Sequence, residues 1–192
     1  MTIRRAFHLS SQTSFSLALV IGVLVTLPSP STRAASVTLT PGKDNTIYGS
    51  GDANLSNGAG QFIFAGSSGA GRVLRGLIAF NLAGQIPAGA TINSVTLTLA
   101  INTPLSANSN TVRLHRVTAD WGEGTSVAPM GGGGGAPAGT GDATWTARIF
   151  NTANWTTPGG DFSSTVSASQ LVSGSSGTAV FTSPGLTADV QA

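Results

Sequence analysis

Cysteine is absent from the 192-residue chain, and lysine occurs once, as Lys43. Without cysteine there are no disulfides, so the fold must depend on its apolar core or on bound ions. The five glycines at 131–135 could suggest a phosphate-binding loop. Such a loop needs a helix start and a lysine soon after its glycines. Here Ala136-Pro137-Ala138 follows instead, so the nucleotide-binding interpretation fails.

Charged residues are also few, at 8% of the chain, and part of the positive charge lies at the N-terminus. Arg4 and Arg5 precede an uncharged apolar run at 15–27, and small residues follow around Ala34-Ala35. This order predicts a secretory signal peptide over residues 1–35, with cleavage after either alanine. The run is shorter than the roughly 20 residues of a spanning helix, so we expect no permanent membrane span.

Removal of residues 1–35 takes away three of the nine basic residues and leaves six against seven acids, a net charge of −1. The remaining chain, 36–192, has the length of one ordinary domain. It contains no basic block, so we expect no nucleic acid partner. We therefore expect a single exported domain that is secreted or held at the cell surface.

Short alternating segments separated by turn residues predict the fold. The clearest alternation places apolar side chains at Val95, Leu97, Leu99 and Ile101. The segment 72–82 is apolar on both faces, which predicts a central strand. Together these patterns favour an all-β, jelly-roll-like antiparallel β-sandwich. After the turn Ser183-Pro184-Gly185, the segment 186–192 predicts a short C-terminal helix.

No strand pattern follows that helix, which leaves two alternatives: a chain that ends on a short helix, or a C-terminally truncated chain. We expect truncation, because the segment 186–192 begins an amphipathic pattern and then stops with no closing strand. A sandwich without its last strands would expose a sheet edge and lose part of its core.

Catalytic motifs are missing from the mature chain. His115 is its single histidine, no G-x-S-x-G sequence occurs, and the few acids do not single out a pair for glycoside hydrolysis. We therefore expect no enzymatic activity. Four acids, however, could hold a structural calcium ion if their loops converge: Asp120, Glu123, Asp142 and Asp161.

Tryptophan supplies the candidate ligand contacts, because its ring can stack on a sugar or pack in a core. The alternation around Trp145 favours a core position, whereas Trp121 and Trp155 remain open between the two roles. Arg113 and His115, on an alternating segment, complete the candidate ligand-binding set, although strand packing is the ordinary role of such a histidine. Trp121 and Trp145 flank a predicted Gly-rich surface loop, 122–143, whose glycine centre we expect to be disordered.

Several segments together resemble the bacterial DNRLRE-type domain. They are DNTIY (44–48), LSNGAGQFIFAG (55–66), the stretch 72–101, VRLHRVTADWGEGTS (112–126), ATWTARIFNTANWTTPGGDF (143–162) and SPGLTADVQA (183–192). The most specific parts are 86–99 and the pair DWGEG and ATW. The family overlaps with a carbohydrate-binding module family known for alginate binding. The resemblance implies an exported jelly-roll β-sandwich, and in similar proteins the chain continues beyond the helix into further strands.

The leading hypothesis is a secreted, non-catalytic carbohydrate-binding or adhesion module whose partner is a polysaccharide, with acidic polymers similar to alginate among the candidates. One alternative is a structural surface or matrix protein with protein partners, and another is a polysaccharide-degrading enzyme. The oligomeric state stays open.

Overall fold

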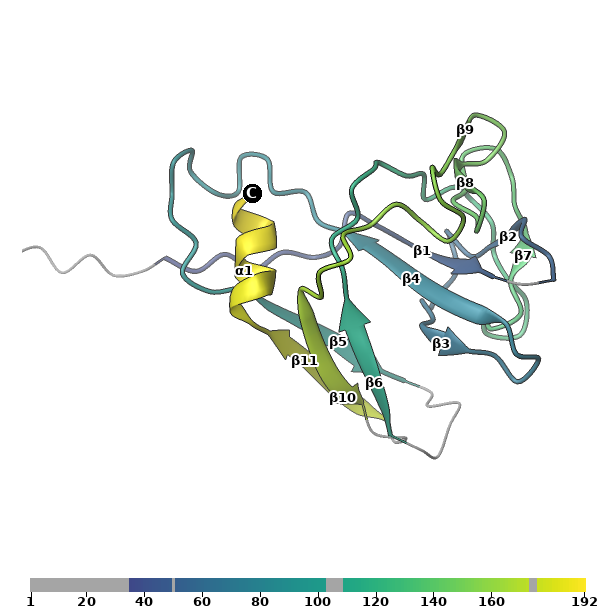
Figure 1. Cartoon of the computed structure of the whole chain (residues 1–192), viewed down its shortest axis with the longest axis horizontal. Coiled ribbons are helices and arrows are strands. Elements are labelled where there is room, and N and C mark those ends of the chain that lie inside the picture. The colour runs from purple at the N-terminus through teal and green to yellow at the C-terminus, as the bar shows by residue number, and fades with distance from the viewer. Residues whose placement is uncertain (1–34, 50, 103–108, 173–175) are drawn as a thin grey trace, which may run out of the picture. The chain divides into compact units, whose positions relative to one another are not determined.

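The structure is a computed structural model that describes residues 35–49, 51–102, 109–172 and 176–192 (Figure 1). Residues Val37–Ala192 form one compact unit. The predicted signal peptide lies, apart from Ala35, outside the described residues. Within the described ranges, no helix is both long enough and apolar enough to cross a bilayer.

An antiparallel sheet of three strands, in the order β1-β4-β3, occupies one part of the unit (Figure 1). Its strands are β1 (Lys43–Tyr48), β3 (Gly66–Ser67) and β4 (Val73–Ala79). Alternation sends Ile47 and Leu77 to one face and Tyr48 and Leu74 to the other, and each pair joins a separate apolar cluster. The prediction of a central strand is thus confirmed, because β4 lies between its neighbours and is covered on both faces.

Two further antiparallel pairs share the third apolar cluster. They are β5 (Thr96–Ile101) with β11 (Gly177–Thr182), and β6 (Asn110–Leu114) with β10 (Ala168–Val172). The cluster is built from alternate residues of all four strands: Leu97, Leu99, Ile101, Val112, Leu114, Ala168, Val172, Ala179 and Phe181. The intervening threonines of β5 are exposed, whereas its apolar side chains face the cluster. The predicted alternation of this strand is therefore confirmed.

The remaining strands are short pairs within long connections. β2 (Leu55–Ser56) pairs with β7 (Ala136–Pro137), and β8 (Ala147–Ile149) pairs with β9 (Ala153–Asn154). A single antiparallel bridge joins Val117 to Phe162. These pairs fix the two ends of the glycine-rich segment and the hairpin that follows it.

Helix α1 (Pro184–Gln191) closes the described chain. Ser183 is its N-cap, and the Ser183 hydroxyl accepts a hydrogen bond from the N–H of Leu186. Proline in the first turn is compatible with a helix because the first N–H groups have no helical partner. Leu186 packs against the third cluster, and the side chain of Gln191 hydrogen-bonds to the backbone of Ala90 and Ile92.

The prediction of an all-β fold with one short C-terminal helix is confirmed. Four strands around one cluster fit a β-sandwich arrangement. The jelly-roll order is not confirmed, because the strands of the described ranges form one three-stranded sheet and four separate pairs.

Candidate functional site

Parts of the segment 119–160 pack on the face of the β1-β4-β3 sheet that carries Ile47 and Leu77. Trp121, Ala143 and Trp155 are buried there and pack with Ile47 and Leu77. Because this packing joins side chains from three distant parts of the sequence, it holds the segment in a defined position on the sheet. The candidate sites described below lie on this segment and on its immediate neighbours.

A buried carboxylate organises the interior of the segment. Asp142 is fully buried, and its Oδ1 accepts hydrogen bonds from the N–H and the hydroxyl of Ser126, at 3.2 and 3.0 Å. Its Oδ2 accepts from the N–H of Gly139 at 2.7 Å. These bonds join the two ends of the glycine-rich loop, so the carboxylate acts as a structural centre.

The glycine-rich centre of the segment does not behave as a disordered spacer, contrary to the sequence-based expectation. The Tyr48 hydroxyl donates a hydrogen bond of 2.6 Å to the carbonyl oxygen of Gly132, and Arg72 donates to that of Gly134. Successive turns are closed by the N–H of Gly132 on Pro129 and the N–H of Gly135 on Gly132. At Gly132 and Gly135 the absence of a side chain allows close packing, which composition alone does not distinguish from flexibility.

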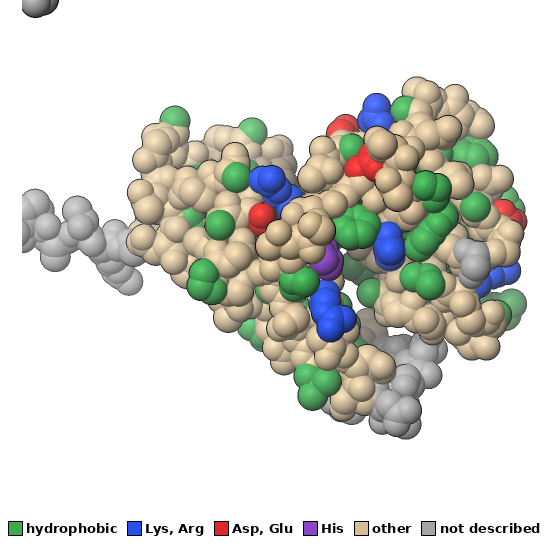
Figure 2. Space-filling view, viewed as in Figure 1, with side chains coloured by type: hydrophobic (Ala, Val, Ile, Leu, Met, Phe, Trp, Pro, Cys, Tyr) green, Lys and Arg blue, Asp and Glu red, His purple; other side chains and the backbone are tan. Residues whose placement is uncertain are grey.

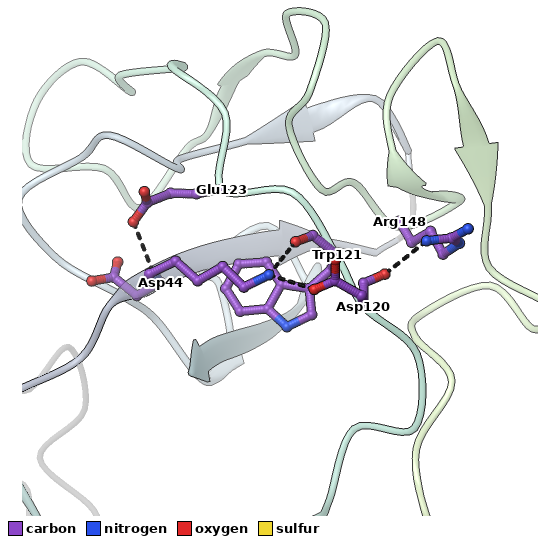
Figure 3. Close-up of polar contacts among 6 residues, drawn as sticks. Asp44, Asp120, Trp121, Glu123 and Arg148 are labelled. Atoms are coloured by element: carbon purple, nitrogen blue, oxygen red, sulfur yellow. Dashed lines mark hydrogen bonds and ion pairs between the residues drawn. The ribbon is translucent and has the colours of Figure 1, made fainter. Parts of the chain in front are cut away.

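A polar cluster at the start of β1 includes Asp44, Asp120, Trp121 and Glu123 (Figure 3), and Lys43 contacts two of them. Its amino group donates to the Asp120 carboxylate at 2.6 Å and to the carbonyl oxygen of Trp121 at 2.5 Å. The same amino group lies 4.6 Å from the centroid of the Trp121 ring. On the next residue, the N–H of Asp44 donates to Glu123 at 2.9 Å. The cluster therefore fastens the 120–123 segment to the edge of the sheet.

The carboxyl group of Asp44, on β1, and that of Asp120, on the segment 119–160, lie in different environments. The hydrogen bond from Lys43 is the main reason why the pKa of Asp120 lies below its usual value. Partial burial, together with repulsion from Glu123, raises the pKa of Asp44. The shift of Asp120 follows from its contact with Lys43, and that of Asp44 from partial burial beside Glu123.

The four acids proposed for calcium do not converge. Asp120 pairs with Lys43, Glu123 accepts from β1, and Asp142 is enclosed by its loop. Asp161 accepts from the N–H groups of 156 and 157, which close a turn of their own. Within the described ranges, no three His, Cys, Asp or Glu side chains gather in a group that could hold a metal ion. The expected calcium site is thus corrected, because Asp120 and Glu123 fasten the 120–123 segment to β1, while Asp142 and Asp161 each fix another loop.

The tryptophans are buried or partly buried, so Trp121 and Trp155, left open between two roles by the sequence, take the core role. Trp121 and Trp155 are each only 4% exposed, so neither offers a free ring face to a sugar. The indole N–H of Trp155 donates to the carbonyl oxygen of Thr144 at 2.9 Å, as a buried indole requires. Trp145, which the sequence places in the core, is only partly buried and packs at the margin of the same cluster.

Trp145 belongs to a surface that we call the Arg75 patch, made of Arg75, Trp145, Phe162 and His115. The guanidinium carbon of Arg75 lies 4.8 Å from the Trp145 ring centroid and 5.0 Å from that of Phe162. The His115 ring meets the Phe162 ring edge to face, with centroids 5.3 Å apart. Figure 2 shows a histidine on this face with basic and apolar side chains beside it.

Arg75 has no carboxylate partner among the described residues, whose ion pairs are Lys43–Asp120 and Arg116–Asp189. Among the described residues it hydrogen-bonds to the carbonyl oxygen of Gly159, and partial burial lowers its pKa. A guanidinium carries five N–H donors, so several donors of Arg75 stay available. The patch therefore presents a fixed, incompletely neutralised cation between two aromatic rings.

Of the predicted ligand residues, His115 lies in this patch and Arg113 is exposed on β6, two positions earlier in the chain. The His115 Nδ1 lies 2.9 Å from the carbonyl oxygen of Ser163, so Nδ1 carries the proton that this bond needs. Sequence reasoning missed Arg75 and Phe162. The available signal was an arginine inside an otherwise apolar strand, RVLRGLIAFNL.

Comparisons of the chain with protein-family models, with curated proteins and with solved structures gave no match. The geometry of the Arg75 patch is therefore the basis for a functional proposal.

Proposed function

We propose that the chain is an exported, non-catalytic module that binds an acidic polysaccharide through the Arg75 patch. The observation that carries the proposal is the half-buried guanidinium of Arg75, stacked between Trp145 and Phe162 without a carboxylate partner in the described chain. A partly desolvated cation without a counter-charge favours an anion supplied from outside the protein.

The position of Arg75 is fixed before any ligand arrives. Two rings and the carbonyl oxygen of Gly159 hold the guanidinium, so binding costs little side-chain entropy. The planar guanidinium matches a carboxylate or sulfate with two parallel hydrogen bonds. The partly exposed rings of Trp145 and Phe162 add apolar surface suited to the C–H face of a sugar ring.

Further support comes from the sequence. The apolar N-terminal run and small-residue cleavage zone favour export, and the resemblance to DNRLRE-type domains favours a carbohydrate-binding module of a bacterial surface or matrix. Uronic acid polymers such as alginate combine the carboxylates and the sugar rings that the patch suits. Arg113, exposed and two residues from His115, would extend the positive surface along a chain-like ligand.

The test is affinity electrophoresis of the mature protein, residues 36–192, in gels that contain alginate, polygalacturonate or the neutral polymer dextran. We expect retardation by an acidic polymer, weakened about tenfold or more in Arg75→Gln, because that change removes the charge and the paired donors. Arg75→Lys should restore only part of the affinity, since an ammonium makes no paired contact.

Arg72→Gln is the matched control, because Arg72 lies on the same segment and hydrogen-bonds to Gly134 without contacting a ring of the patch. It should bind as the unchanged protein does. Equal retardation of Arg75→Gln and the unchanged protein would exclude the patch as the binding site. Retardation by neither acidic polymer would reject the proposal, and reducing ends released from either polymer would favour a degrading enzyme.

A further inference from the structure

A second surface feature lies on the β8–β9 hairpin. It is an open cavity of about 360 Å³, bounded by the hairpin and by the turn before β2. Apart from two alanines, its lining consists of three asparagines, two threonines and one phenylalanine: Asn54, Thr146, Phe150, Asn151, Thr152 and Asn154. No lining residue carries a charge, which separates this cavity chemically from the Arg75 patch.

The polar side chains of the cavity are unused within the described structure. Neither the amides of Asn54, Asn151 and Asn154 nor the hydroxyls of Thr146 and Thr152 hydrogen-bond to any described residue. Each amide offers two N–H donors and one carbonyl acceptor, and each hydroxyl can donate and accept. The cavity therefore presents several mixed donor and acceptor groups around one aromatic ring.

The backbone that carries these groups is well anchored. The N–H of Thr152 donates to the carbonyl oxygen of Ile149 and closes the hairpin turn, and the N–H of Phe150 donates to that of Asp142 at 2.8 Å. Asn151 takes φ 63 in that turn, a left-handed conformation that asparagine tolerates better than most residues. Asn151 is exposed in that turn and belongs to the lining of the cavity.

We propose that this cavity is a binding site for one or two neutral sugar residues. Adjacent sugar hydroxyls donate and accept at short spacing, as carboxamides do, and the Phe150 ring can cover the apolar face of a pyranose. An anionic ligand would find no cation in the lining, and a metal ion would find no carboxylate. The site goes beyond the acidic-polysaccharide proposal and does not rest on it.

The experiment is a titration of the mature protein with cello-, xylo-, manno- and maltohexaose, followed by amide signals in two-dimensional NMR. We expect one of these neutral oligosaccharides to shift the side-chain amide signals of Asn54, Asn151 and Asn154. Asn151→Gly keeps the left-handed turn and removes only the amide, and it should weaken binding about five- to tenfold. Asn154→Ala should have a similar effect.

Two controls make the outcome decisive. Asn93→Ala removes an exposed asparagine outside the cavity and should leave neutral-sugar binding unchanged. Arg75→Gln should also leave it unchanged, even if it abolishes binding to alginate. No shift with any of the four hexaoses at millimolar concentration would overturn the proposal, as would equal affinity of Asn151→Gly, Asn154→Ala and the unchanged protein.

Discussion

Arg75 and Trp145 lie in contact through a cation–π arrangement, with the guanidinium carbon 4.8 Å from the ring centroid, although they come from distant parts of the chain. Gly159 connects them: its N–H donates to the carbonyl oxygen of Trp145, and its own carbonyl oxygen accepts from Arg75. The geometry of the patch therefore depends on a backbone position that itself carries no side chain.

Gly159→Ala should destabilise the protein and disturb the patch. A Cβ there would lie 2.7 Å from an Arg75 nitrogen and 2.8 Å from the Trp145 ring, at a φ of +96°. We expect the free energy of unfolding to fall by about 2–3 kcal/mol in urea titrations. Gly141→Ala is the control, because its φ is +93° but no atom lies within 4 Å. It should cost only about 1 kcal/mol, and equal losses would contradict the packing role of Gly159.

Tyr48, the single tyrosine of the chain, should make stability depend on alkaline pH. Burial raises its pKa to about 12, from an ordinary value of 10.0. Because the unfolded chain loses this proton first, the stabilisation is full below about pH 10 and is lost as pH rises towards 12. Urea titrations should show that loss in the unchanged protein and a smaller one in Tyr48→Phe. Tyrosinate absorbance of the folded protein measures the ionisation of Tyr48 directly. A titration midpoint near pH 10 would contradict the burial of its hydroxyl.

Asp142→Asn should weaken the attachment of the glycine-rich segment. One oxygen of the carboxylate accepts hydrogen bonds from Ser126, and the other accepts one from Gly139. An asparagine amide has a single acceptor oxygen, so it can keep the bonds on one side only. The buried donor left unpaired should lower the free energy of unfolding by about 2–3 kcal/mol. Glu123→Gln is the matched control in thermal unfolding, because its remaining oxygen still accepts from Asp44. A similar loss in both variants would show that Asp142 has no special role.

Asp120 should contribute a small, pH-dependent stabilisation. Its pKa lies below the usual value mainly because of Lys43, so the contribution is present above the unfolded pKa of about 3.9 and is lost as pH falls below it. The pair is exposed, so Asp120→Asn should cost no more than about 0.5 kcal/mol at neutral pH. That difference from the unchanged protein should vanish in acid and shrink in high salt. A difference independent of both would mean that charge is not its cause.

Local patterns were enough to predict the strands whose side chains alternate. They also predicted that a short helix lies at the C-terminal end of the described chain. The alternation from Val95 to Ile101 predicts which side of β5 is apolar, because inward and outward positions repeat every two residues. The sequence places this helix over 186–192, after a turn at 183–185. Helix α1 begins earlier, at Pro184, because the Ser183 hydroxyl caps it and proline fits the first turn.

The candidate site was predictable only in part, because it is made by contacts between distant segments. Trp121, Trp145 and Trp155 have similar local sequences, yet two are buried and one is at the surface. Their burial depends on which part of the segment 119–160 packs against the sheet, and no short-range sequence pattern indicates that packing. The same holds for Arg75, whose partners come from two later segments.

The packing of the glycine-rich run has a consequence for protein engineering. A flexible spacer would accept an alanine, an affinity tag or an inserted peptide at any of its five glycines. Here a Cβ at Gly135 would lie 2.9 Å from Leu55 and one at Gly132 would lie 2.8 Å from Phe64, whereas Gly134 has open space around it. Tolerance to insertion should therefore differ from one glycine of the run to another, with Gly132 and Gly135 the least tolerant. Gly134 is the position at which a fusion would leave the fold intact.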